Sequence, residues 1–211
     1  MFKPVNRVIK FLIASNFFLY SAWGFVMPIF AIFIIQNIKV DSPAEAAKIA
    51  GFAFFTYWFV KSTMQIPISL FLDARHGEKD DFWFMILGLI ITGIAPLGFM
   101  ISKLPWHVYT FEAIHAIGMA LIIPSWNAIF TRHMDRGREA FEWAMDSTCL
   151  GFGVAITGAI GGLVAATFGF TFIFIAVALV NFFAAFVTIL VHKDILPKDH
   201  ILSWLPRPGP F

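Results

Sequence analysis

Ionisable side chains stand inside long apolar stretches of this sequence, where charges are costly and usually functional. Lys61 lies near the middle of the apolar stretch 49–72, and Glu112 and His115 lie three residues apart in the stretch 108–131. Residues three apart share one face of a helix. Burial favours a neutral carboxyl group, a nearby cation favours the charged one, and histidines ordinarily titrate near neutral pH. Glu112 and His115 are therefore predicted to couple proton movement to function; the alternative is a static, water-exposed pair.

Uncharged polar and aromatic residues predict a binding surface beside these charges. Asn16, Tyr20 and Trp23 recur at helical spacing, Trp126 is followed by Asn127, and Gln65 lies one turn from Lys61. Tryptophan can stack on a sugar-like solute and asparagine can hydrogen-bond it. The same rings can instead hold a lipophilic cation or pack against lipid. Lys61 makes an anionic solute a minor alternative. The residues predicted to line a substrate cavity are Asn16, Tyr20, Trp23, Lys61, Gln65, Trp126 and Asn127.

Several classes of chemistry have no matching pattern in the sequence. There is no phosphate-binding loop and no His-Glu-x-x-His motif, and the single cysteine, Cys149, excludes a disulfide framework or a zinc cluster. The formal net charge of +2 is too small for a basic nucleic-acid-binding face. We expect no enzyme, no cofactor, no metal and no nucleic-acid partner.

The composition indicates which elements must carry these residues. Among 211 residues, 59% are hydrophobic, 13% are charged and 27 are phenylalanine. A soluble protein of this size cannot bury so much apolar surface, because much of its surface stays exposed to water. The composition therefore predicts a protein that crosses the lipid bilayer several times.

Six apolar stretches are long enough to cross a bilayer as helices, which requires roughly 20 residues each. They are 11–35, 49–72, 82–102, 108–131, 143–166 and 171–191. The predicted fold is an all-α membrane protein with a six-helix bundle over 1–192 and a cytoplasmic tail over 193–211.

The distribution of lysine and arginine predicts the orientation in the membrane. With six spans, 11 of the 15 Lys and Arg residues fall on the side of both termini, and three fall on the other side. Cytoplasmic loops carry the excess of positive charge. Both termini are therefore predicted to be cytoplasmic, in a plasma or inner membrane.

The connections between the apolar stretches resemble signatures of the major facilitator superfamily. Residues 73–79, Asp-Ala-Arg-His-Gly-Glu-Lys, resemble its loop motif Gly-x-x-x-Asp-Arg-x-Gly-Arg-Arg, with Ser69 in place of the first glycine. Residues 112–118 are similar to its Arg-x-x-Gln-Gly-x-Gly motif, with Glu112 and His115 replacing the arginine and the glutamine.

Two later segments carry the same resemblance. Residues 157–162, Thr-Gly-Ala-Ile-Gly-Gly, resemble the Gly-Pro-x-x-Gly-Gly motif of family antiporters without its proline, and Phe168-Gly169-Phe170 resembles the family's Gly-Trp-Arg turn. Within six helices, the resemblance implies two inverted three-helix units, with bends at Pro28 and Pro124 in the first helix of each.

The resemblance also implies an assembly, because the family usually has about twelve helices in two halves. Two copies with cytoplasmic termini can form a parallel twofold homodimer, with Gly151, Gly158 and Gly162 packed against the partner; packing within one subunit is the alternative. A fragment of a longer protein and a half that pairs with a different half remain open.

The resemblance further implies a cytoplasmic charge network that latches the two halves. The predicted gate residues are Asp73, Arg75, Asp135 and Asp146. The alternatives are a solvated loop and, for Asp146, a carboxylate favoured by a helix N-terminus.

The predicted function is movement of a small solute across the lipid bilayer by alternating access, as proton-coupled symport or antiport. The alternative is a membrane assembly or regulatory subunit that has the same fold and does not transport.

Overall fold

The chain folds into helices throughout most of its length. The computed structural model describes residues 4–75 and 77–196, apart from the side chain of Arg75, and contains no β-strand within those ranges. The helices are α1 (Arg7–Val26), the 3-10 helix η1 (Met27–Ile29), α2 (Phe30–Asn37), α3 (Pro43–Arg75), α4 (Glu78–Ile101), α5 (Pro105–His133), α6 (Glu139–Ile189) and α7 (His192–Ile195). The all-helical prediction is confirmed.

Within the described residues, four helical stretches are long and apolar enough to cross a membrane. They are Arg7–Asn37, Glu78–Ile101, Pro105–His133 and Glu139–Ile189. Helix α3 has 33 residues, but Lys61 and Gln65 lower its mean hydropathy. Length and composition therefore establish a multi-pass membrane protein.

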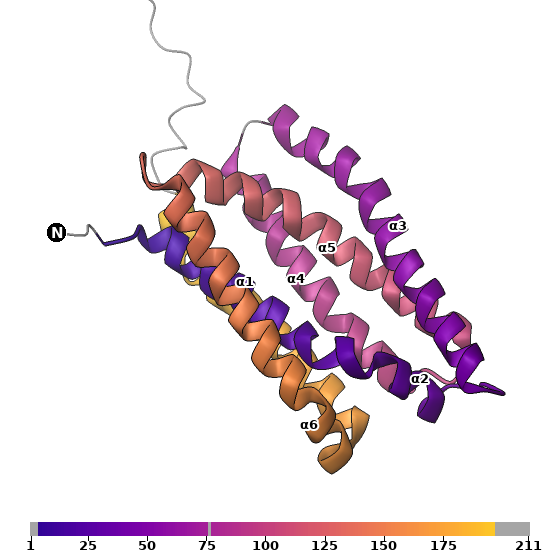
Figure 1. Ribbon diagram of the computed structural model, residues 1–211. Helices are drawn as coiled ribbons and strands as arrows, with labels where there is room; N and C mark the ends of the chain where they lie inside the picture. Colours follow the sequence, from indigo (N-terminus) through magenta and orange to yellow (C-terminus); the bar gives the residue numbers. More distant parts are fainter. Residues whose placement is uncertain (1–3, 76, 197–211) are drawn as a thin grey trace, which may run out of the picture.

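Helix α6 contains a reversal at Gly169. Its 51 residues would measure about 77 Å if straight, far more than a hydrocarbon core of about 30 Å. Gly169 has φ 80° and ψ 168°, a conformation that favours glycine. The reversal is visible in Figure 1, where the last part of α6 runs back behind α1. The two parts correspond to the predicted stretches 143–166 and 171–191.

The first apolar stretch is also interrupted. Between α1 and α2, residues Met27–Ile29 form a single 3-10 turn that includes Pro28. Proline has no backbone N–H to donate to the preceding helical turn, so the α-helix is interrupted at Pro28, the position at which a bend is predicted. Pro124 lies inside α5, which continues past it to His133.

The helices pack in two close pairs with a more peripheral helix beside them. Helix α1 packs against α6, α4 packs against α5, and α3 lies along α5 on one side of the bundle (Figure 1). A Cβ atom on Gly88 would lie 2.6 Å from the Gly118 carbonyl oxygen. Only glycine allows α4 and α5 to approach this closely.

The glycines of α6 face two directions. A side chain at Gly161 would meet the Phe25 carbonyl oxygen at 2.7 Å, whereas one at Gly151 would meet nothing within 4 Å. At Gly158 the nearest atom would be Pro28 Cγ at 3.6 Å, and at Gly162 it would be Ile29 Cγ2 at 4.0 Å. The helix therefore packs on α1 through Gly161 and leaves Gly151 uncovered in one copy of the chain.

Candidate functional site

A cavity of about 400 Å³ lies between α1, α3 and α5. Its walls are mostly apolar and aromatic, and its ionisable lining residues are Tyr20, Tyr57, Lys61, Glu112 and His115. Trp23 and Trp58 also line it. The structure thus brings five of the residues singled out in the sequence into one cavity: Tyr20, Trp23, Lys61, Glu112 and His115.

Lys61 is buried at this cavity against aromatic rings. Its Nζ atom lies 3.5 Å from the centroid of the Trp58 ring and 5.2 Å from that of Tyr57. All three residues are on α3, where spacings of three and four place side chains on one face. An ammonium group over a ring is attracted to its negative face. Within the described part of the chain, Lys61 forms no ion pair.

Glu112 and His115 are in contact on α5. His115 Nδ1 lies 3.3 Å from Glu112 Oε2, and both side chains are buried. The His115 ring stacks on Trp23 of α1, with centroids 3.5 Å apart, and lies 4.7 Å from the Tyr57 ring of α3. The imidazole is therefore held between rings from two other helices, which fixes its orientation toward Glu112.

A second, smaller cavity of about 180 Å³ holds four of the eight remaining predicted residues. Asn16, Tyr20, Trp126, Asn127 and Asp146 line it, so Tyr20 borders both cavities. Asn16 Nδ2 lies 2.9 Å and 3.1 Å from the two carboxylate oxygens of Asp146. Trp126 Nε1–H donates to the Leu12 carbonyl oxygen at 3.2 Å, so this indole is anchored to α1.

The other predicted residues are dispersed. Gln65 is half-buried on α3 and lines neither of these two cavities. Of the predicted gate, Asp146 lies in the bundle beside Asn16, Asp73 is exposed, and Asp135 lies 3.8 Å from Arg138. The side chain of Arg75 lies outside the described residues.

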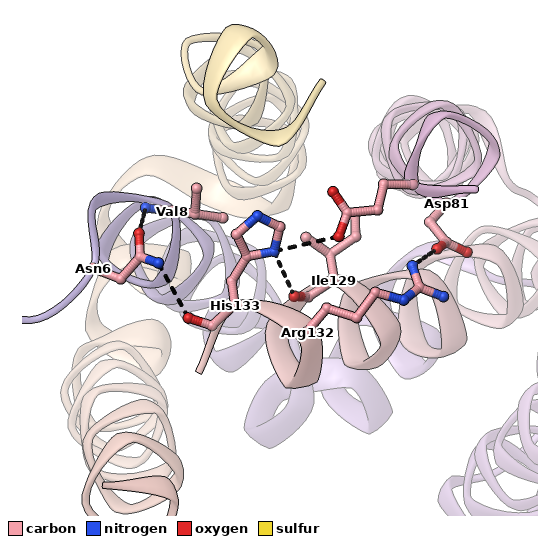
Figure 2. Close-up of polar contacts among 7 residues, drawn as sticks. Asn6, Val8, Asp81, Ile129, Arg132 and His133 are labelled. Atoms are coloured by element: carbon pink, nitrogen blue, oxygen red, sulfur yellow. Dashed lines mark hydrogen bonds and ion pairs between the residues drawn. The ribbon is translucent and has the colours of Figure 1, made fainter. Parts of the chain in front are cut away.

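A polar cluster at one end of the bundle connects three helices instead (Figure 2). Arg132 of α5 pairs with the buried carboxylate of Asp81 on α4, and His133 Nδ1 lies 3.6 Å from Glu78 Oε1. Asn6 Nδ2 donates to the His133 carbonyl oxygen at 3.1 Å, and Asn6 Oδ1 accepts from the Val8 backbone N–H, capping α1. The cluster ties the start of α1 and α4 to the end of α5.

Sequence reasoning missed both the Asp81–Arg132 pair and the rings around Lys61. Asp81 directly precedes the stretch 82–102, and Arg132 directly follows the stretch 108–131. The ends of consecutive antiparallel helices meet, so this opposite pair was detectable. Tyr57 and Trp58 were detectable as well, because they precede Lys61 by four and three residues.

Comparison with known proteins gives a family for the chain. The family model of the Major Facilitator Superfamily matches residues 12–208. A search of curated proteins found no match. The match covers nearly the whole chain, and the described helices are long and apolar enough for its membrane fold. The chain therefore belongs to the major facilitator superfamily, whose members are generally membrane transporters.

Proposed function

We propose that this chain is one six-helix half of a secondary transporter that moves a small solute by alternating access. The observation that carries the proposal is the cavity between α1, α3 and α5. Small-molecule sites are mostly apolar cavities with a few convergent polar groups, and this cavity joins aromatic walls to Lys61, Glu112 and His115 from two helices. An assembly subunit that does not transport has no need for a cavity that combines aromatic walls with charged side chains.

Six crossings agree with the lengths of the helices. Helix α3 is about 50 Å long at 1.5 Å per residue, which exceeds the hydrocarbon thickness of about 30 Å. The reversal at Gly169 divides α6 into two more crossings. The Asn6–His133 and Glu78–His133 contacts join segments that a six-span topology places on the same side, and the lysine and arginine bias makes that side cytoplasmic.

A parallel homodimer would complete the transporter. Three residues support this: Gly151 of α6 has open space over it, and Phe55 and Phe59 of α3 are exposed. Small residues allow close helix approach in lipid, and a second copy related by a twofold axis would bring α6 against its α3. The two cavities would then face each other across the dimer.

Proton coupling is assigned to Glu112 and His115. The two groups touch inside the cavity, so a change in the accessibility of the cavity would change the hydration of both. The pair would then carry a proton between the two sides of the membrane as the cavity changes its accessibility.

Reconstitution into liposomes tests this function. A pH-sensitive dye trapped inside liposomes should report proton movement when members of a panel of sugars, organic cations and organic acids are added outside. Glu112→Gln should abolish proton movement and spare exchange of labelled solute, and Glu139→Gln, an exposed carboxylate on α6, is the matched control. Proton movement that persists unchanged in Glu112→Gln would remove this residue from the mechanism, and no solute flux of any kind would favour the assembly subunit.

The oligomer is tested by fusing two copies of the chain in tandem. The fusion should transport as well as the separate chains do. Protein that transports while strictly monomeric in the membrane would contradict the homodimer.

A further inference from the structure

The two opposite charges that border the larger cavity, Lys61 and Glu112, form no ion pair with each other. Glu112 is engaged by His115, at 3.3 Å on the same helix. Lys61 lines the same cavity from α3, its Nζ atom lies over the rings of Trp58 and Tyr57, and it forms no ion pair among the described residues. The ammonium group of Lys61 is therefore the charge in this cavity that a bound solute is able to neutralise.

An uncompensated lysine inside a membrane protein is costly. The rings of Trp58 and Tyr57 offset part of that cost. A carboxylate would offset much more, because a charge-assisted hydrogen bond is stronger where water is excluded. The same geometry disfavours a cationic solute, since Lys61 repels it and already covers the Trp58 ring.

The walls of the cavity determine the rest of the solute. Leu19, Val26, Phe30, Phe54 and Met119 present apolar surface, which gains from contact with an apolar or aromatic body. A sugar would bury several hydroxyl groups here with few partners, which is unfavourable. The volume of about 400 Å³ lies in the range of small-molecule sites.

We propose that the cavity binds a small amphipathic monocarboxylate, with its carboxylate on Lys61 Nζ and its apolar body against the aromatic walls. This assignment deepens the proposed transport function and rests on it for the identity of the cavity as the solute site. It selects one solute class from those that the sequence leaves open: sugar-like, cationic or anionic.

Ligands that share one body and differ in charge test the assignment. The probes are 2-naphthoate, 2-naphthamide, 2-naphthylmethylammonium and the zwitterion 2-naphthylalanine, titrated by calorimetry and thermal shift onto protein in uncharged lipid nanodiscs. We expect 2-naphthoate to bind the wild type about tenfold or more tightly than the other three, as a charge-assisted contact predicts.

Substitutions at Lys61 locate the binding. Lys61→Met should weaken 2-naphthoate binding by about tenfold and leave 2-naphthamide binding unchanged, while Lys61→Arg should retain most of the affinity. The matched control is Lys48→Met, because Lys48 is an exposed lysine on the same helix that does not line the cavity. Because Lys61→Arg retains the positive charge at position 61, it also tests whether a folded variant with that charge retains its affinity for 2-naphthoate.

The outcomes separate this assignment from the proposed function. Preference for the ammonium or the zwitterion, equal binding of all four probes, or unchanged naphthoate affinity in Lys61→Met would overturn the monocarboxylate. If Lys61-dependent naphthoate binding is found but liposomes show no flux, the solute class stands and transport fails. If liposomes transport a sugar or a cation independently of Lys61, transport stands and the solute class fails.

Discussion

The cation at the α4–α5 contact, Arg132, has a carboxylate partner, whereas the cation at the α1–α3–α5 cavity, Lys61, has none among the described residues. Arg132 pairs with the buried carboxylate of Asp81 on the neighbouring helix, close to the bundle end. Lys61 lies within the long helix α3 with ring faces as its contacts. A paired charge holds two helices together, whereas an unpaired charge beside a cavity is available to a ligand. We therefore propose that Arg132 contributes to stability and that Lys61 contributes to binding.

The helices that carry Arg132 and Lys61 also differ in how closely they pack against their neighbours. Helices α4 and α5 approach through Gly88 and Gly118. Helix α3 lies on the side of the bundle, along α5 (Figure 1), and Phe54, Phe55 and Phe59 on it are exposed. The tight pair forms a rigid support, and the more loosely held helix carries the cavity lysine.

Asp81→Asn should produce the largest loss of stability. It leaves Arg132 opposite a neutral amide, and breaking a buried pair costs 3–5 kcal/mol, reduced here because Arg132 is partly exposed. We expect a loss of about 2–3 kcal/mol in the free energy of unfolding in mixed micelles. The control is the cycle with Arg132→Gln, whose effect should be strongly non-additive. Additive losses would mean that the pair does not couple the helices.

Gly118→Ala should produce the next largest effect. The added Cβ would lie 2.8 Å from the Gly88 carbonyl oxygen and 2.9 Å from the Thr92 backbone nitrogen, so the helices must separate. Overpacking of this kind costs about 1–3 kcal/mol, measurable in the same unfolding experiment. Gly51→Ala, at a glycine of α3 with open space over it, should cost less than about 0.5 kcal/mol. Equal effects of the two substitutions would contradict the close α4–α5 approach.

Trp58→Leu should have a smaller effect on stability and a clear one on the cavity. The substitution removes the ring beneath the Lys61 ammonium, worth about 0.5–1 kcal/mol at a partly exposed site. Naphthoate affinity should change, because Lys61 loses its positioning contact. Trp106→Leu, at an exposed tryptophan of α5, is the control and should leave that affinity unaltered. A Trp58→Leu protein with wild-type binding would separate Trp58 from the site.

Lys61→Met should have the smallest effect on stability. It removes an unpaired buried charge and leaves no counter-ion behind, so unfolding should change by less than about 0.5 kcal/mol or shift toward greater stability. The same unfolding measurement checks it beside Asp81→Asn. A loss as large as that of Asp81→Asn would show that Lys61 is a structural charge, and the comparison would fail.

Much of the fold followed from one-dimensional patterns. Apolar length and helical spacing predicted the helices, the reversal near Gly169 and the shared face of Glu112 and His115. These features depend on neighbours along the chain, where helical geometry is fixed. The position of Tyr57 and Trp58 against Lys61 is of the same local kind and was accessible.

The pairing of Asp146 with Asn16 could not be predicted from residue spacing. Residue spacing gives the face of a helix on which a side chain lies, but not the rotation of one helix against another. That rotation results from packing, including the approach of Gly161 to Phe25, and it turns Asp146 toward α1. The expectation that Asp146 belongs to a cytoplasmic network came from the family resemblance, which leaves this rotation undetermined.

We propose that the cavity between α1, α3 and α5 opens alternately to the two sides of the membrane, and thiol labelling tests this directly. The single native cysteine, Cys149, makes a direct measurement simple, because Cys149→Ser gives a cysteine-free background. Met119→Cys then places one thiol in the cavity wall, and Leu163→Cys, an exposed residue of α6, is the lipid-facing control. We expect a membrane-impermeant thiol reagent to label position 119 from either side of the membrane and to block transport, while position 163 is unlabelled from both sides. Labelling of position 119 from one side only, with transport intact after labelling, would contradict it.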